Sequence, residues 1–289
     1  MGYSDPRLLP SGKLQFRLSR QLAYYSKQDP PPSRVKPIPS GILQHTVTLL
    51  RLGNHARAHT MADMLTLGFY FLLRPGEYAL TSNPDSSPFT IQDVHLLVGQ
   101  TRIPHLSCPT EALDRATFVC LEFTTQKNGI RGELIGLGRS GNSAFCPVQA
   151  IINRIRHLRT FNARPSTPLY AFFYHAWFAI STANLTAELR NSVATLGAAM
   201  GLSPDDISIR SLRSSGAMAL LCANVDTDRI RLLGRWRSDE MLRYLHVQAY
   251  PVVATLAPAM LRHGNFSLLQ NQQLPQPRLP PGTGATRGL

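Results

Sequence analysis

The segment 117–137 constrains the fold of this chain more than any other. It reads TFVCLEFTTQKNGIRGELIGL, and apolar, β-branched and aromatic residues alternate with polar ones on both sides of Asn128-Gly129. Asn-Gly is a strong signal for a tight turn between antiparallel strands, because both residues tolerate a positive φ. The segment therefore predicts a β-hairpin with Lys127 at its tip.

Helical patterns lie on both sides of this hairpin. Apolar residues recur at helical spacing in 41–53 and 58–73, and the second pattern ends at Arg74-Pro75-Gly76. The same spacing returns after the hairpin in 148–158, 182–201, 210–224, 228–234 and 239–250. The predicted fold class is therefore mainly α with a small antiparallel β-sheet (α+β), inserted after the second helix.

Small polar residues stand where three of these helices begin. Ser40 precedes the first helix, Asp226 and Thr227 precede 228–234, and Ser238 precedes the last. Their side chains can accept a hydrogen bond from an N–H of the first helical turn. Ser40, Ser238 and one of Asp226 or Thr227 are therefore the predicted N-caps.

Proline marks both ends of the patterned region. Residues 1–39 are basic and include DPPPSRVKPIPS, which predicts an extended linker or the remnant of a preceding domain. Residues 265–289 include LPQPRLPPGTGATRGL and predict a disordered tail rich in Pro and Gly. The region between them, 40–264, is the predicted globular domain.

The charge of the chain points to a polyanionic partner. Lys and Arg outnumber Asp and Glu by 30 to 17, which gives a net charge of +13. The only lysines are Lys13, Lys27, Lys36 and Lys127, so nearly all of the cationic residues are arginines. Arginine binds phosphate through two parallel hydrogen bonds, which favours nucleic acid over the alternative of a basic protein without such a partner.

The cysteines and the apolar segments exclude several classes of protein. The four cysteines are scattered, without the close pairs of a zinc site or a small disulfide scaffold, which predicts a reducing compartment. No signal peptide and no apolar run of about 18 residues is present, so no membrane association is predicted.

Several cationic and aromatic residues at element ends are candidates for a site. Arg74 lies in LLRPGEY, Arg210 and Arg213 lie in IRSLR, and Trp236 and Tyr244 lie in LGRWRS and LRYLH. Each has an ordinary structural explanation: a cation at a helix end, a surface pair at a helix start, and aromatic residues of the core. Their order along the chain is what suggests a shared function.

In this order the chain resembles the catalytic domain of tyrosine recombinases, the phage integrase family, over about residues 40–262. The family has an arginine in a Leu-Arg-x-x-Glu setting, which LRPGE matches with Arg74 and Glu77. It has a lysine on a β-hairpin, which Lys127 matches, and a His-x-x-Arg box, which reads Arg210-Ser-Leu-Arg213 here.

The last part of the resemblance covers 207–246. The family has Leu-Gly-His or Gly-Trp next, matched by LLGRW, and a tyrosine nine residues after that histidine. Counting from Arg235 gives Tyr244, and His246 completes a Tyr-x-His ending. LRPGEY and GRW look most like recombinases of eukaryotic mobile elements, such as Cryptons and tyrosine-recombinase retrotransposons.

The resemblance implies an enzyme that cuts and rejoins DNA through a 3′-phosphotyrosine, without metal, ATP or any other cofactor. Tyr244 would be the nucleophile, and Lys127, the only lysine after Lys36, would protonate the leaving 5′ oxygen. The remaining implied groups surround the scissile phosphate: Arg74, Arg210, Arg213 and Trp236 or Arg235, with Glu77 and His246 in support. Glu77 orients Arg74 in this interpretation, and a simple surface pair is the alternative.

Two departures from the family pattern bear on activity. Arg210 replaces the usual histidine, which keeps a phosphate donor but removes a group that exchanges protons near neutral pH. Trp236 lies one residue later than the family's His or Trp, and Arg235 occupies the aligned position. Either side chain can donate a hydrogen bond to a phosphate oxygen, so the sequence leaves open which of them faces it.

The resemblance also implies partners. These are double-stranded DNA and further copies of the chain, as a homo-oligomer (tetramer) on paired sites, in an intracellular location that is the nucleus if the host is eukaryotic. Family members carry a helical domain before the catalytic one, whereas about forty residues precede it here, so a fragment, a lost domain and a partner that holds the DNA are all open. Other candidates for contacts to the DNA backbone are Arg154, Arg156, Arg159, Arg229, Arg231, Arg237 and Arg243.

Three alternatives remain open on the sequence. A type IB topoisomerase uses similar residues, but the short interval between Arg213 and Tyr244, with LGRW inside it, fits recombinases better. A decayed or domesticated copy would bind DNA without cutting it, which the replacement at Arg210 favours. A basic scaffold protein would resemble the family by accident.

Overall fold

The computed structural model describes residues 5, 7, 11–28, 35–124, 132–236, 257–258 and 261. The chain divides into two units, Met1–Leu245 and His246–Leu289, and the elements below belong to the first. The predicted helix at 239–250 with its cap Ser238, and the predicted disordered tail 265–289, lie outside the described residues. No described helix has both the length and the apolarity needed to cross a membrane.

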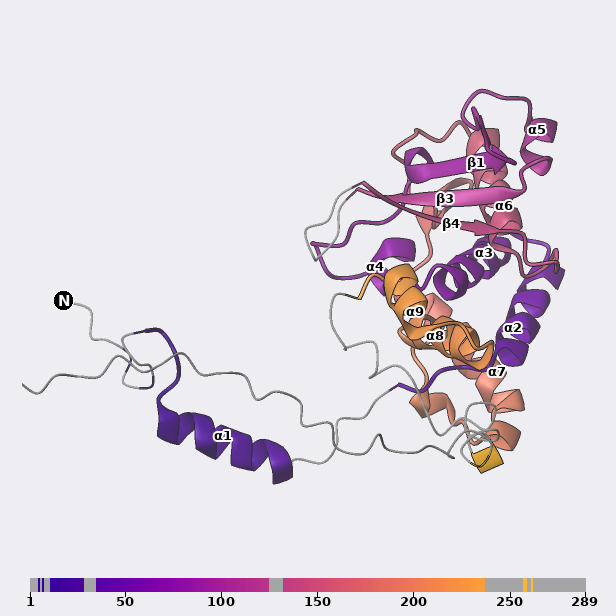
Figure 1. Cartoon of the computed structure of the whole chain (residues 1–289). Coiled ribbons are helices and arrows are strands. Elements are labelled where there is room, and N and C mark those ends of the chain that lie inside the picture. Colours follow the sequence, from indigo (N-terminus) through magenta and orange to yellow (C-terminus); the bar gives the residue numbers. More distant parts are fainter. Residues whose placement is uncertain are drawn as a thin grey trace, which may run out of the picture. The chain divides into compact units, whose positions relative to one another are not determined.

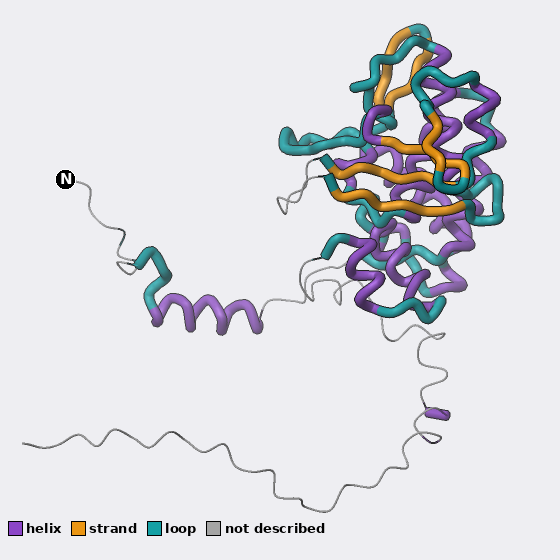
Figure 2. Tube along the Cα trace, turned by 45° about the horizontal axis from the view of Figure 1, so that its top comes forward, coloured by secondary structure: helices purple, strands orange, loops and turns teal. Residues whose placement is uncertain are grey.

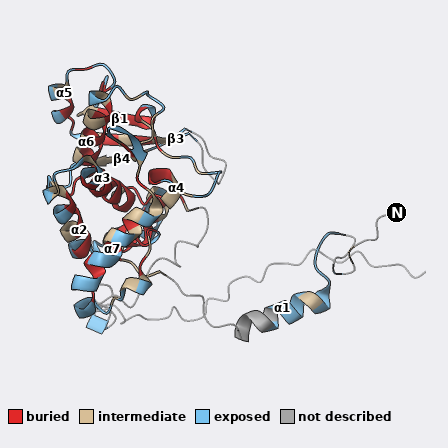
Figure 3. Ribbon diagram, turned by 180° about the vertical axis from the view of Figure 1, so that it is seen from behind, coloured by how far each residue is buried: buried red, intermediate tan, exposed pale blue. Residues whose placement is uncertain are grey.

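Helix α3 is the centre of the domain. Nearly all of its residues are buried, and Figure 3 shows it in red between the sheet and the other helices. α2, α6 and α8 pack against α3, and α7 packs against α2 (Figure 1). The five helices are α2 (Ser40–Leu52), α3 (Ala56–Tyr70), α6 (Pro147–Thr160), α7 (Thr182–Leu196) and α8 (Ser211–Cys222). All five were predicted from apolar spacing, and this arrangement confirms the mainly helical class.

The predicted hairpin is part of a four-stranded antiparallel sheet. β3 (Phe118–Phe123) pairs with β4 (Glu133–Gly138) in a register that places Val119 opposite Leu137. The sheet order is β2-β1-β3-β4, with β1 (Val94–Val98) and β2 (Thr101–Ile103) added to the predicted pair. Strands are drawn in orange in Figure 2. α6 packs against β3 and β4, so the sheet buries one face against the helices. β1 and β2 were not predicted.

A second, two-stranded sheet was also not predicted. β5 (Ala171–Tyr174) and β6 (Ala176–Ala179) form an antiparallel hairpin that turns at His175, whose φ is 60°. β5 packs against α3 and α6. The hairpin therefore joins the helical layer along β5.

The remaining described elements are short, and the first or last residues of some helices differ from the prediction. They are α1 (Phe16–Gln28), α4 (Pro75–Tyr78), α5 (Thr110–Asp114), α9 (Thr227–Gly234) and the 3₁₀ turns η1 (Ile91–Asp93), η2 (Ala198–Met200) and η3 (Pro204–Asp206). α1 ends just before the proline-rich stretch that begins at Asp29, and it was not predicted. Ser40 is the first residue of α2 rather than its cap, which is Pro39. Asp226 caps α9, accepting from the backbone N–H of Asp228 at 2.8 Å.

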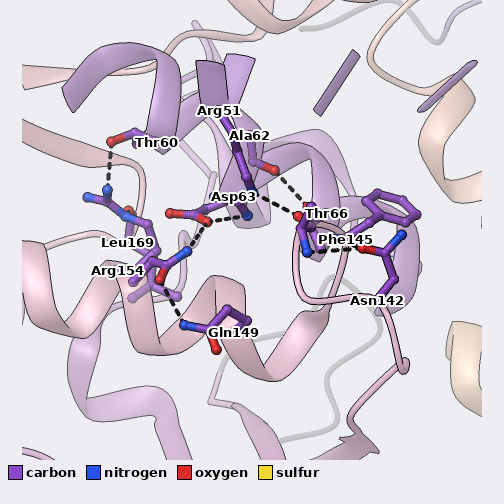
Figure 4. A network of polar contacts seen from close by, with 12 residues as sticks. Arg51, Thr60, Ala62, Asp63, Thr66, Asn142, Phe145, Gln149, Arg154 and Leu169 are labelled. Atoms are coloured by element: carbon purple, nitrogen blue, oxygen red, sulfur yellow. Dashed lines mark hydrogen bonds and ion pairs between the residues drawn. The ribbon is translucent and has the colours of Figure 1, made fainter. Parts of the chain in front are cut away.

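A buried polar network joins α3, α6 and β5 (Figure 4). The Arg154 side chain donates to the Leu169 carbonyl at 2.9 Å, to Thr60 Oγ1 at 2.6 Å and to the Ala171 carbonyl. Asp63 accepts from Arg51 in the same region at 2.9 Å. Burial lowers the pKa of Arg154 to about 10. The prediction that Arg154 contacts DNA is wrong, because its side chain is enclosed by the protein.

His157 makes the stability of the domain depend on pH. Its Nε2 accepts the backbone N–H of Phe173 in β5 at 3.0 Å, which requires the neutral ring. Burial, with Arg154 and His59 nearby, lowers the pKa of His157 from 6.5 to about 4. As the pH falls through this window, the unfolded chain takes up a proton here that the folded chain does not. We therefore expect about 1–2 kcal/mol of stability to be lost between pH 6.5 and 4, after allowing for solvent screening.

Urea unfolding of the wild type and of His157→Gln at a series of pH values measures this effect. The glutamine can still accept the Phe173 N–H but does not titrate, so the difference between the two proteins isolates the histidine. Parallel pH profiles for the two proteins would contradict the assignment.

Candidate functional site

The site is built around the turn that follows α3. Leu72 adopts a left-handed backbone conformation with φ of 52°, which a leucine takes only when its surroundings impose it. The chain then enters the short helix α4 at Arg74. The carbonyl groups of Phe71 and Leu72 accept hydrogen bonds from side chains of α8 and of the end of α9.

Arg213 reaches this turn from the first turn of α8. One terminal nitrogen, Nη1, donates to the Leu72 carbonyl at 2.7 Å, and Nη2 donates to the Gly234 carbonyl. Arg213 is 6% exposed, and its guanidinium carbon lies 4.3 Å from the ring centroid of Trp236. The guanidinium group is therefore held in one orientation by two carbonyls and an aromatic face.

Small residues on α8 allow this close approach. A Cβ at Gly216 would overlap the backbone oxygen of Phe69, so α8 can lie against α3 at this depth only with glycine. The neighbouring residues Ser214, Ser215 and Ala217 are also buried. The small residues after Arg213 therefore lie close behind it, against α3.

Arg235 lies in the same cluster but points inward. It caps α9 with φ of 58°, and its side chain is 1% exposed. Nη2 donates to Glu77 Oε2 at 3.0 Å, and Nη1 donates to the Phe71 carbonyl at 3.3 Å. Its guanidinium carbon lies 3.8 Å from the ring centroid of Phe123 in β3. Burial lowers the pKa of Arg235, while the carboxylate of Glu77 opposes this shift.

Trp236, and not Arg235, is therefore the member of this pair that can meet a ligand. Trp236 is half-buried and lies against Arg213, whereas the Arg235 side chain is enclosed. Gly234 makes room for Trp236, since a Cβ at position 234 would overlap the indole ring. The part of the prediction that allowed Arg235 to donate to a phosphate is wrong, because the left-handed cap turns its side chain into the core.

Glu77 joins Arg74 and Arg235. One carboxylate oxygen accepts from the Arg74 backbone N–H at 2.7 Å and from Arg235, and the other lies 3.4 Å from Arg74 Nη1. Glu77 is buried, so the alternative of a simple surface pair is wrong. The Arg74 side chain keeps 33% of its surface exposed and is the most accessible of the three clustered guanidinium groups.

The cluster has an excess of positive charge. Arg74, Arg213 and Arg235 carry three positive charges, whereas Glu77 and Glu133, which both favour the charged form of Arg235, supply two negative charges, so a net charge of +1 remains. Fixed charges in a partly buried site act more strongly than charges in water. The arrangement can therefore bind an anion and stabilise negative charge that develops on it.

Of the other predicted site residues, Arg210 is exposed without a hydrogen bond to this cluster, and the rest lie outside the described residues. Arg210 is exposed at the start of α8, and only its backbone N–H, which donates to Ser208 Oγ, has a hydrogen bond to a described residue. Lys127, Tyr244 and His246 lie outside the described residues, as do Arg237 and Arg243. Their assigned roles stay predictions.

The candidates for contacts to the DNA backbone also differ in their surroundings. Arg156 pairs with Asp114 at 2.8 Å on the surface, and Arg159 donates to the Cys108 carbonyl at 2.7 Å. Arg229 and Arg231 lie on α9, where Arg231 pairs with Asp228 at 3.1 Å.

The role of the Leu72 carbonyl could not be predicted from the sequence. A backbone carbonyl is present at every residue, so no residue type marks it as an acceptor. In the sequence, Pro75 indicates only that the helical pattern before it ends.

Comparisons with known proteins give a limited likeness. No protein-family model matches the chain, and no curated protein matches it. A structure of the Tn1549 transposon integrase with transposon right end DNA is 10% identical, with a TM-score of 0.44, over 82% of this chain and 68% of that one. A second structure of this integrase, with circular intermediate DNA, is 12% identical, with a TM-score of 0.40, over 81% and 66%. Likeness at this level assigns neither a family nor a function.

Proposed function

We propose that this chain is a site-specific DNA recombinase or integrase of the tyrosine recombinase type, encoded by a mobile element. One observation carries the proposal. The segments 73–77, 210–213 and 234–236, which the motif resemblance selected from the sequence alone, meet at the Leu72 carbonyl and at Glu77. An accidental match of short motifs would have no reason to bring three distant segments together.

The proposed reaction uses the cluster to hold one scissile phosphate of double-stranded DNA. Tyr244 gives its hydroxyl proton to solvent as its oxygen attacks the phosphorus, the bond to the 5′ oxygen breaks, and a 3′-phosphotyrosine forms. Lys127 gives its proton to the departing 5′ oxygen, and a 5′ hydroxyl of the partner strand later reverses the step. Each step exchanges one phosphodiester for another, so neither ATP nor a redox partner enters the balance.

The charges of the cluster suit this chemistry. Negative charge grows on the nonbridging oxygens in the transition state, and preorganised donors stabilise it most where water is largely excluded. Arg74, Arg210 and Trp236 are the proposed outer donors, and Arg213 is the inner one. Glu77 and Arg235 are positioning residues, because they hold Arg74 and the turn after α3 rather than the phosphate.

The test is a search for a covalent adduct. The full chain is incubated with nicked duplexes from its own element, resolved under denaturing conditions, and digested to identify the peptide that carries the nucleotide. The expected product links the 3′ phosphate to Tyr244. An adduct that persists in Tyr244→Phe would contradict the assignment of the nucleophile.

Two other outcomes would favour the alternatives. Salt-sensitive DNA binding without an adduct would indicate a decayed recombinase that acts as a DNA-binding module. Neither binding nor an adduct would indicate a scaffold protein. The proposed tetramer on paired sites, and a nuclear location in a eukaryotic host, depend on the first outcome.

Arg210 allows a test that separates activity from folding. Arg210→Ala should leave the free energy of unfolding within about 0.5 kcal/mol of the wild type, because its side chain has no hydrogen bond to a described residue. Adduct formation should slow by about 10- to 100-fold if the exposed guanidinium contacts the phosphate. Rates under single-turnover conditions measure this, with Arg210→His as the variant that restores the family residue. An unchanged rate in Arg210→Ala would remove Arg210 from the site.

A further inference from the structure

The β5–β6 hairpin carries an exposed aromatic surface. Tyr174 is 61% exposed, Phe178 50% and Trp177 43%. Tyr174 and Phe178 lie on one face of the hairpin and Trp177 on the other, where Phe161 at the end of α6 adds to it because its ring stacks on Phe173 with centroids 4.6 Å apart. Exposed aromatic side chains gathered on one short hairpin mark interaction surfaces more often than scattered ones do.

The same surface has no formal charge in a strongly basic chain. Residues 165–187 contain no Asp, Glu, Lys or Arg, although the chain as a whole has a net charge of +13. DNA binding depends on Lys and Arg that neutralise phosphates, so this segment is a poor surface for DNA. Its partner must be recognised through apolar contact and backbone hydrogen bonds.

The outer edge of β6 offers such backbone groups. The N–H of Phe173 in β5 donates to His157, and the N–H of Ile180 donates across the hairpin to the Tyr170 carbonyl. In an antiparallel pair, opposite residues alternate between those that exchange hydrogen bonds and those that do not. Tyr170 and Ile180 are of the first kind, so Phe173 and Trp177, which lie opposite each other, are of the second kind. The N–H and C=O of Trp177 therefore point away from β5, and no described segment beyond β5 pairs with them.

Exposed strand edges usually carry lysine, proline or an inward-pointing charge that prevents pairing with another chain. β6 has none of these, because its sequence is Ala176-Trp177-Phe178-Ala179. β5 lacks a comparable open edge, because the outward groups of its backbone already have partners. The Phe173 N–H donates to His157, and the Ala171 carbonyl accepts from Arg154. Two of the exposed aromatic rings, those of Trp177 and Phe178, belong to the strand whose outer edge no described segment covers.

We propose that β6 is a self-association edge, which pairs antiparallel with β6 of a second copy to form a continuous sheet β5-β6-β6-β5. Identical edges related by a two-fold axis satisfy each other's N–H and C=O groups and bring Trp177 and Phe178 of both copies together. Two copies with equal positive charge approach most easily through a neutral surface. The strand has four residues, so the dimer is reversible rather than permanent.

Sedimentation velocity of the full chain without DNA tests the proposal. Between about 1 and 100 µM, the mass should rise from that of one 32.0 kDa chain toward twice that value. Trp177→Arg should weaken association at least about tenfold, because it places like charges opposite each other at the centre of the paired edge. Leu52→Arg is the matched control, because Leu52 is 76% exposed on α2, away from the hairpin, and should leave the dimer intact.

Salt separates this dimer from association through residual DNA. Raising the salt concentration screens the repulsion between the two basic copies and should strengthen the dimer, whereas DNA-mediated association would weaken. Phe178→Arg serves as a second variant, and circular dichroism and the unfolding midpoint show that each variant is folded. A wild type that stays monomeric throughout, or a Trp177→Arg variant that associates as Leu52→Arg does, would overturn the proposal. A monomer that binds an added strand-forming peptide would assign the edge to another protein and would overturn it equally.

Discussion

Arg213→Lys is expected to slow formation of the covalent DNA adduct by about 100- to 1000-fold while the chain remains folded. Lysine keeps the charge but lacks the planar group that meets the carbonyls of Leu72 and Gly234 while lying against Trp236. The remaining positive charge would no longer be fixed in direction, and one buried carbonyl would lose its donor. We expect a loss of about 1–3 kcal/mol in the free energy of unfolding.

Single-turnover adduct formation at saturating DNA, together with urea unfolding, measures both effects. Arg139→Lys is the matched control, since Arg139 also donates to two backbone carbonyls, those of Ala116 and Asp114 at 2.8 and 2.9 Å, but lies at the surface after β4. Its adduct rate should equal that of the wild type. A rate that falls equally in both variants would show that Arg213 acts only through stability.

Arg154→Met is expected to cost about 3–5 kcal/mol of unfolding free energy. The substitution removes the donors to Thr60, to the Leu169 carbonyl and to the Ala171 carbonyl, all in the interior. It also removes one of the two cations that favour ionisation of the buried Asp63. Methionine fills much of the space, so the loss comes from unpaired polar groups rather than from a cavity.

Arg156→Met, on the same helix, is the control for this change. Arg156 pairs with Asp114 where both side chains are exposed, and such pairs contribute about 1 kcal/mol or less. Urea unfolding of the two variants at neutral pH compares them directly. Similar losses would mean that the Arg154 network does not hold α3, α6 and β5 together.

The helices were predictable because their burial is periodic. α2, α6, α7 and α9 each turn one apolar face toward the core, whereas α3 and the first two turns of α8 are buried on nearly all sides, and this leaves a pattern in the sequence. The strands β1, β5 and β6 are four or five residues long and apolar, so their periodicity does not distinguish strand from helix. Their pairing depends on distant residues, such as Leu121 opposite Val94, that no local pattern reveals.

The residue types of the candidate site could be predicted from the sequence, but the directions in which their side chains point could be predicted only in part. Arg74, Glu77 and Arg213 were recognised by their order along the chain, and the structure brings them to one turn. The inward direction of Arg235 depends on a left-handed backbone conformation at the end of α9. A non-glycine residue gives no signal for that conformation, so the sequence could not choose between Arg235 and Trp236.

The Leu72 carbonyl accepts hydrogen bonds from arginines that follow it by 141 and 163 residues. At ordinary rates of protein synthesis, roughly 10–30 s separate the emergence of this carbonyl from that of its second partner. A nascent chain, or a product of premature termination before residue 235, therefore carries much of the positive charge of the protein without the assembled arginine cluster. Translation itself thus delays the assembly of the arginine cluster until nearly the whole domain has been made.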